Sequence, residues 1–239
     1  MFLGLLGATG MAAFLAGCEN PRAGGTHLPD PFGPDVAGGG VWGGGPERDI
    51  YPPLPKLPLP PPPTPHQPPV AVNGIFPRTL WAKAGPDIKH LDPMNGIKRI
   101  TFHHSGDPKP FITTNFSETA QHLEFVRSYH RSRNFQDIGY HFAIDRAGRV
   151  WQLRSLMYQG QHVRGNNEHN LGVVVLGNFD QQAMSPAQKD KVKIFGTLLR
   201  KQYNLPVSRI YTHQEIVSTG CPGKAMQPYL VSLRKQQQI

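Results

Sequence analysis

The sequence of 239 residues contains only two cysteines, Cys18 and Cys221. Two cysteines cannot build the framework of several disulfides on which many small secreted domains depend, so each needs an explanation of its own. The sequence also lacks any run of five or more basic residues. Such runs are typical of segments that bind nucleic acid, and their absence argues against that partner.

Residues able to form a core are scarce in the first third of the chain. Residues 21–69 hold 16 of the 25 prolines and 9 of the 26 glycines, about half of that segment. Such a segment cannot bury enough apolar surface to offset the entropy lost on folding. We therefore expect the folded part to lie within residues 73–239, a length that suits one domain.

Net charge divides the chain at the same place. Residues 1–72 carry 3 basic and 5 acidic side chains, whereas residues 73–239 carry 22 basic and 11 acidic ones, a net charge of +11. A domain this basic favours an anionic partner, such as a membrane surface, a nucleic acid or an acidic polymer. Charge alone does not choose among these three.

The amino-terminal segment is apolar and uncharged. Residues 1–17 are followed by Cys18, and the junction reads LAGC. The segment has the length of a signal-peptide apolar region and is short for a bilayer span. It resembles the lipobox of bacterial lipoproteins, which implies that residues 1–18 are a signal peptide, that Cys18 carries a lipid, and that the protein is anchored in the cell envelope on the periplasmic side of a bacterial membrane. The alternative is a transmembrane stub with an incidental cysteine.

Residues 19–72 suit a spacer between that anchor and the folded domain. Their first part contains the glycine triplets 38–40 and 43–45, and Gly-rich chains are flexible. The stretch from Pro52 to Pro69 favours polyproline II, a semi-rigid form that rises about 3.1 Å per residue. We therefore expect a disordered tether. A ligand for proline-binding modules is the other interpretation, and it suits an exported bacterial protein less well.

Hydrophobic patterns in residues 73–239 predict alternating strands and helices. Short β-branched and aromatic runs predict strands, and the sequence DRAG at 145–148 is typical of a hairpin turn. Apolar residues at helical spacing predict helices, one of which begins with Ser185 as N-cap and Pro186 in the first turn. The expected strands are 99–103, 140–144, 150–153, 171–176 and 209–213, and the expected helices are 117–133, 185–203 and 227–237. This alternation predicts an α/β fold with a mixed central β-sheet flanked by helices.

Histidines and the second cysteine mark a candidate metal site. His103 and His104 end the first expected strand, His141 lies in a middle strand, and His213 precedes Cys221 by eight positions. Two imidazoles and one thiolate favour Zn²⁺, and three protein ligands leave a fourth position open, as in catalytic zinc sites. The sequence contains 11 histidines, and most histidines have no metal to bind, so spacing alone does not choose the ligands.

Four motifs between Trp81 and the C-terminus occur in an order and at a spacing typical of one enzyme family. They are HHS at 103–105, IGYHF at 138–142, the segment 162–172, and the segment 213–223, which ends in CPG. Together they resemble the zinc N-acetylmuramoyl-L-alanine amidases of type 2, which include phage lysozyme-type amidases and peptidoglycan recognition proteins. The resemblance implies the fold of that family and hydrolysis of the amide bond between N-acetylmuramic acid and L-Ala in peptidoglycan.

The resemblance also implies which residues form the active site. One Zn²⁺ per chain would be held by His103, His213 and Cys221. Tyr140 and Thr219 would be catalytic, because a hydroxyl can donate a hydrogen bond to the oxyanion that develops on the scissile carbonyl.

A loop of the family that lines the substrate groove matches the segment containing His162 and Arg164. We expect both side chains to bind substrate, with Arg164 able to pair with a carboxylate of the stem peptide. Glu168 and Glu215 lie near the motifs and could act as a general base, but acids are mostly exposed, so we interpret them as surface residues. His141 is expected to be a core residue.

The stem peptides of peptidoglycan carry carboxylates, which accounts for the basic domain without nucleic acid. We expect the protein to act as a monomer. One alternative is a module of the same fold that binds peptidoglycan without cutting it, and another is a structural anchor between wall and membrane. A complete set of metal ligands together with Tyr140 favours the enzyme, since an anchor needs no metal ligands.

Replacement of Cys18 by Ser tests the expected lipid anchor. We expect the wild-type protein, expressed in a bacterium fed labelled palmitate, to carry the label, and Cys18→Ser to lose it, because serine lacks the thiol. Cys221→Ser is the matched control and should keep the label. A wild-type protein without label would show that Cys18 is not lipidated.

Overall fold

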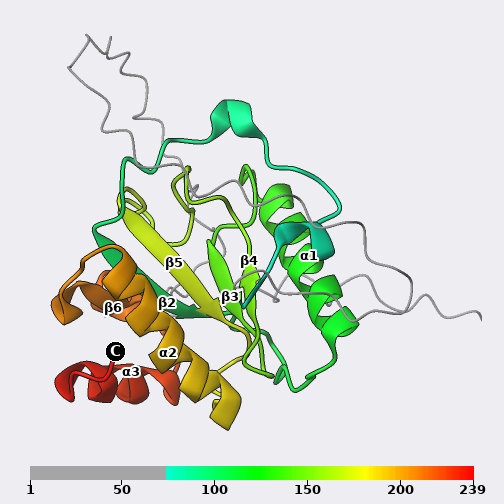
Figure 1. Cartoon of the computed structure of the whole chain (residues 1–239). Coiled ribbons are helices and arrows are strands. Elements are labelled where there is room, and N and C mark those ends of the chain that lie inside the picture. Colours follow the sequence, from blue (N-terminus) through cyan, green and yellow to red (C-terminus); the bar gives the residue numbers. More distant parts are fainter. Residues whose placement is uncertain (1–73) are drawn as a thin grey trace, which may run out of the picture. The chain divides into compact units, whose positions relative to one another are not determined.

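The computed structural model describes residues 74–239; the expected signal peptide, Cys18 and the tether over residues 19–72 lie outside the described residues. Six strands form one mixed sheet in the order β1-β4-β3-β5-β2-β6 (Figure 1). The strands are β1 Ile75–Phe76, β2 Arg99–His104, β3 Phe142–Ile144, β4 Val150–Gln152, β5 Asn170–Val175 and β6 Ile210–Thr212. Only the β3–β4 hairpin is antiparallel among these neighbours. The predicted α/β class is confirmed.

Three α-helices begin and end within two residues of their predicted limits. They are α1 Phe116–Ser132, α2 Pro186–Gln202 and α3 Met226–Lys235. The helix α2 starts as predicted, with Ser185 accepting a hydrogen bond from the backbone of Gln188 in a complete capping box. No helix within residues 74–239 combines the length and apolar character needed to cross a bilayer.

Helices cover both faces of the sheet, and each face has its own apolar cluster (Figure 1). Alternate residues of a strand point to opposite faces. On β2, Ile100 and Phe102 belong to the cluster that contains Phe195 of α2 and Leu230 of α3. The cluster on the other face contains Leu123 of α1. The strand β5 is buried along its whole length, as its continuous apolar sequence predicts.

The strand β3 begins two residues later than its pattern predicts. Tyr140 and His141 precede it, although His141 still pairs with both neighbouring segments through backbone hydrogen bonds to Gly172 and Leu153, each 2.9 Å. The physical reason is a close approach at Gly139, where an added Cβ would lie 2.5 Å from the backbone oxygen of Gln161.

The buried side chain of Arg154 forms hydrogen bonds to both of the segments that approach each other at Gly139. Its side chain is 2% exposed, and it donates hydrogen bonds to the backbone oxygens of Asp137, Ile138 and Gln159 and to Oε1 of Gln161. Burial lowers the pKa of Arg154 to about 10, still far above neutral pH, so the guanidinium keeps its charge. The residue therefore holds two segments that lead directly to Tyr140 and His162.

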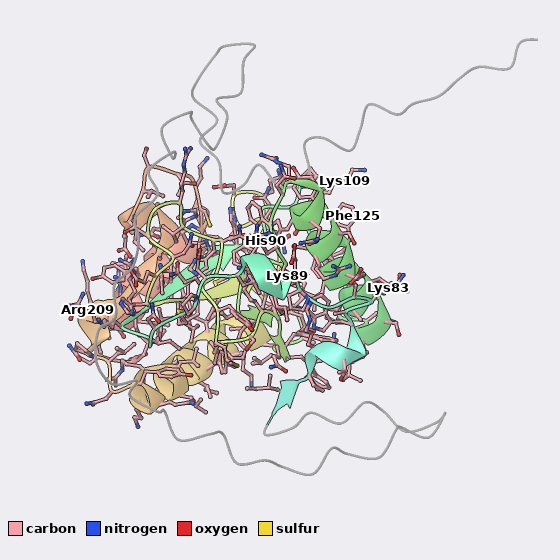
Figure 2. All side chains as sticks on the ribbon, turned by 90° about the horizontal axis from the view of Figure 1, so that it is seen from above. Lys83, Lys89, His90, Lys109, Phe125 and Arg209 are labelled. Carbon is pink, nitrogen blue, oxygen red and sulfur yellow. The ribbon has the colours of Figure 1, made fainter. Side chains whose placement is uncertain are left out.

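Basic side chains lie on more than one side of the domain. Figure 2 shows Arg209 at the opposite edge of the domain from Lys83 and Lys109. These three basic side chains therefore do not lie together in one strip of the kind that a nucleic-acid groove presents.

Replacement of Arg154 by Met tests its contribution to the fold. Methionine fills much of the same volume but leaves several buried oxygens without a donor, so we expect the free energy of unfolding to fall by about 3–5 kcal/mol. Urea denaturation measures the change. Arg131→Met is the control, because the exposed Arg131 donates one surface hydrogen bond to Phe135, and a change within about 0.5 kcal/mol is expected. Equal effects of the two substitutions would contradict the role given to Arg154.

Candidate metal centre

Parallel pairing of two strands brings two histidines together. In the register of β2 and β6, Phe102 lies opposite Thr212. The residue that follows each of them in the sequence is a histidine: His103 lies on β2, and His213 begins the 3-10 helix His213–Glu215 directly after β6. The rings of His103 and His213 have their centroids 4.6 Å apart. The carboxyl ends of parallel strands meet at one edge of a sheet, so the pairing itself creates this cluster.

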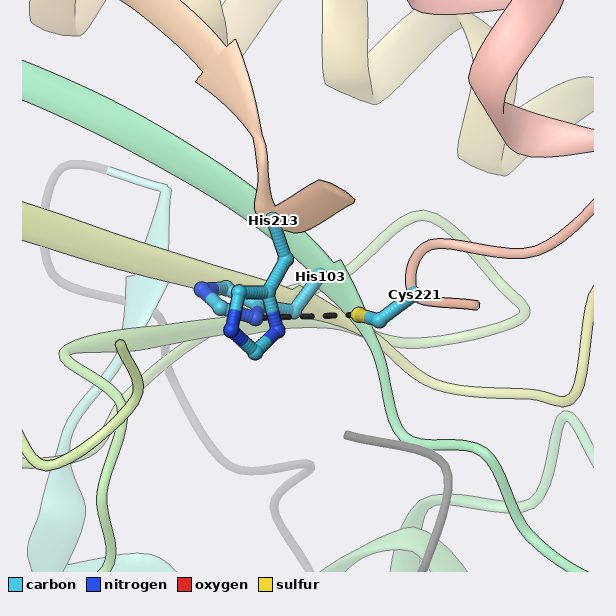
Figure 3. Close-up of side chains that lie close together, drawn as sticks. All are labelled: His103, His213 and Cys221. Carbon is cyan, nitrogen blue, oxygen red and sulfur yellow. Dashed lines mark hydrogen bonds between the residues drawn. The ribbon is translucent and has the colours of Figure 1, made fainter. Parts of the chain in front are cut away.

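The loop after β6 returns Cys221 to the same edge. The backbone N–H of Gln214 donates to the oxygen of Cys221 at 2.9 Å, which closes the loop. Sγ of Cys221 then lies 3.7 Å from Nδ1 of His103, and Figure 3 shows the three side chains converging. His103, His213 and Cys221 are all buried, and one ligand atom from each lies within 4.8 Å of the other two.

The donor atoms fit a zinc ion by three criteria. In a tetrahedral site with Zn–N of about 2.0 Å and Zn–S of about 2.3 Å, nitrogen and sulfur ligands are about 3.5 Å apart. The distance from Nδ1 of His103 to Sγ of Cys221, 3.7 Å, is close to this value. Nδ1 of His213 is buried and has no hydrogen-bond partner among residues 74–239, as expected of an atom that binds a cation. The backbone N–H of His104 donates to Sγ of Cys221 at 3.4 Å, a contact that favours the thiolate.

Tyr140 lies beside these donors. Its side chain is 7% exposed, and its ring centroid lies 5.2 Å from that of His103. The backbone at Tyr140 is held by two hydrogen bonds. The backbone N–H of Gly139 donates to Nδ1 of His130 at 3.0 Å, and the backbone N–H of Arg154 donates to the backbone oxygen of Tyr140 at 3.0 Å. The Tyr140 ring is therefore fixed at the edge of the metal cluster.

Thr219 lies in the loop that carries the cysteine. Its Oγ1 accepts a hydrogen bond from the backbone N–H of Cys221 at 3.3 Å. This contact uses a lone pair of the hydroxyl and leaves its proton available to a further acceptor.

His162 lies against the metal cluster, whereas the family resemblance implies a loop that lines the substrate groove. Only 6% of it is exposed; its Nδ1 lies 3.0 Å from Nε2 of His103, and its Nε2 lies 3.1 Å from the oxygen of Asn170. Burial lowers the pKa of His162 well below its ordinary value, so the ring is neutral. Arg164 lies exposed on the same loop. The assignment of both residues to substrate binding stays a prediction.

Comparison with known proteins agrees with this geometry. A family model described as N-acetylmuramoyl-L-alanine amidase (Amidase_2) matches residues 93–224. The chain belongs to this family. The matched segment contains all three metal-ligand candidates together with Tyr140 and His162.

Relatives of this amidase-family chain include enzymes and recognition proteins by name. A mouse N-acetylmuramoyl-L-alanine amidase is 31% identical over 161 residues, which cover 64% of this chain and 29% of the mouse protein. A peptidoglycan-recognition protein of Drosophila simulans is 29% identical over 160 residues, 65% of this chain and 84% of that protein. The crystal structure of Drosophila peptidoglycan recognition protein SD matches with a TM-score of 0.58 at 26% identity, over 66% of this chain and 92% of that one. The chain thus spans less than a third of the mouse relative.

His141, the histidine beside Tyr140, lies in the core of the amidase-family domain, as expected. Its Nδ1 accepts from the backbone N–H of Gly172 at 2.9 Å, and its Nε2 donates to the oxygen of Tyr158 at 3.0 Å. Burial lowers its pKa to about 4. Both nitrogens are therefore used in holding the backbone together.

The two glutamates near the family motifs have other partners. Glu215 accepts from the backbone N–H of Thr212 at 2.8 Å and forms an ion pair with Arg234. The hydrogen bond from Arg234 is among the causes that hold the pKa of Glu215 below its ordinary value, although burial opposes it. Glu168 is exposed and lies 3.6 Å from His169. These contacts agree with the interpretation of both acids as surface residues.

Proposed function

We propose that the domain over residues 73–239 hydrolyses the amide bond between N-acetylmuramic acid and L-Ala of peptidoglycan, with one Zn²⁺ held by His103, His213 and Cys221. The observation that carries the proposal is the convergence of these three buried donors beside Tyr140. Three ligands leave a position open for substrate or water, which distinguishes a catalytic site from a closed structural one.

When bound, zinc supplies a Lewis acid that activates water and polarises a carbonyl group. Two hydroxyl groups of the chain supply hydrogen-bond donors for the reaction. The Tyr140 hydroxyl donates a hydrogen bond to the oxyanion that develops on the scissile carbonyl. Thr219, whose Oγ1 accepts from the backbone N–H of Cys221, has a hydroxyl proton left to donate, and it adds positioning without a positive charge.

Charge and family membership support the proposed substrate. The carboxylates of peptidoglycan stem peptides complement a domain whose 22 basic side chains outnumber its 11 acidic ones. Arg164, exposed on the loop of His162, has the planar geometry to bind a stem carboxylate through two hydrogen bonds. Nucleic acid is not needed to account for the charge.

We further propose that the protein works as a monomer attached to the periplasmic side of a bacterial membrane by a lipid on Cys18. Residues 19–72 then set how far the catalytic domain reaches into the wall. This part of the proposal rests on the sequence alone.

A second function has support of its own, because several relatives are named as peptidoglycan recognition proteins. A module that binds peptidoglycan without cutting it would use the same fold. The two functions differ in whether bonds are broken, so one assay separates them.

Release of peptides from intact sacculi tests the proposal. We expect the zinc-loaded protein to release peptides with a free N-terminal L-Ala, a chelator to stop the release, and added zinc to restore it. Tyr140→Phe should lower the rate about 10²- to 10³-fold, since it removes only the proposed oxyanion donor. Tyr229→Phe is the matched control and should keep full activity, because the Tyr229 hydroxyl bonds the backbone of Lys189 on the surface. Zinc-loaded protein that pellets with sacculi but releases nothing would leave the binding module as the function.

A further inference from the structure

The two ring nitrogens of His103 face different partners. Nδ1 lies 3.7 Å from Sγ of Cys221, and Nε2 lies 3.0 Å from Nδ1 of His162. A neutral imidazole carries one proton, so Nδ1 can bind a metal only while the proton is on Nε2. The group that accepts this proton in a hydrogen bond therefore decides which nitrogen of His103 has a lone pair for the metal.

His162 meets the requirement for that acceptor. Its Nε2 lies 3.1 Å from the oxygen of Asn170, and a carbonyl oxygen only accepts, so Nε2 carries the single proton of this ring. The lone pair of its Nδ1 then points at His103. Asn170 is itself fixed, because its side chain accepts from Thr101 at 2.7 Å and donates to the oxygen of Asn166 at 2.8 Å.

We infer that His162 is a positioning residue for the metal centre, which holds His103 in the tautomer and orientation that aim Nδ1 at Cys221. In this arrangement Nε2 of His103 donates to Nδ1 of His162, and Nε2 of His162 donates to the carbonyl oxygen of Asn170. Partners behind a metal-binding histidine typically raise its affinity and fix its ring. The inference rests on the proposed function in one respect, that His103 binds zinc.

The backbone around His162 leaves space for an imidazole at this place. An added Cβ on Gly172 would lie 2.5–2.7 Å from three atoms of the His162 ring, and one on Gly160 would lie 2.3 Å from its Cδ2. Such approaches are far inside van der Waals contact, so no side chain larger than glycine's fits at either position without moving the ring. Two glycines from separate segments thus form the cradle of His162.

Replacements of His162 test the inference by zinc affinity, measured in competition with a chromophoric chelator. His162→Leu removes the acceptor, and we expect the affinity to fall by about 10- to 100-fold. His162→Asn restores an acceptor oxygen close to the place of Nδ1, and we expect an affinity within about threefold of wild type. His122→Leu is the control, because the contacts of His122 within residues 74–239 are with Asp107, Phe111 and Phe125 and with no residue of the metal cluster, and it should leave zinc affinity unchanged.

The backbone gives a second, independent variant. Gly172→Ala displaces the His162 ring without changing any polar group, so it should also weaken zinc binding, and it should add no further loss when combined with His162→Leu. Circular dichroism confirms that each variant is folded before it is compared.

Nitrogen NMR of the wild-type protein loaded with zinc tests the inference without any substitution. We expect His103 and His162 both to carry their proton on Nε2. The inference is overturned by a proton on Nδ1 of His162, by a His162→Leu protein that binds zinc as tightly as wild type, or by equal losses in the Leu and Asn variants. A wild-type protein that binds no zinc would instead contradict the proposed function, so the two failures are distinguishable.

Discussion

Parallel pairing of β2 with β6 is the constraint on which the site depends. The register that sets Phe102 opposite Thr212 makes the following histidines neighbours at one edge of the sheet, and the loop after β6 needs only eight residues to return a thiol to them. Burying two imidazoles and a thiol costs free energy unless they find polar partners. A cation shared by all three would offset this cost, and it explains why such residues can be tolerated inside the domain.

The surrounding residues act on the cluster through backbone groups and through side chains. An amide N–H from His104 reaches the sulfur, the Asn170 carbonyl fixes the ring behind His103, and His130 and Arg154 hold the chain on either side of Tyr140. Backbone groups carry no net charge, so they orient the donors without competing for the cation. The site is thus rigid because the sheet and its adjoining loops are rigid.

Much of the fold could be predicted because its signals are local. The capping box at Ser185 and the apolar strand β5 are each determined by a few adjacent residues. The late start of β3, after Tyr140, depends instead on the contact of Gly139 with Gln161, which no local pattern records. A prediction from sequence misses the burial of His162 for the same reason, because that burial depends on Gly172, ten residues away, and on His103, 59 residues away. The two-residue strand β1 is too short to leave a pattern.

The proposed function requires that one zinc ion is bound by two imidazoles and one thiolate. X-ray absorption at the zinc edge of the purified, zinc-loaded protein measures this ligand set directly. We predict one sulfur at about 2.3 Å and nitrogen ligands at about 2.0 Å, with the sulfur signal lost in a Cys221→Ala protein. A spectrum without sulfur in the wild-type protein, or one unchanged by the loss of Cys221, would contradict this ligand set.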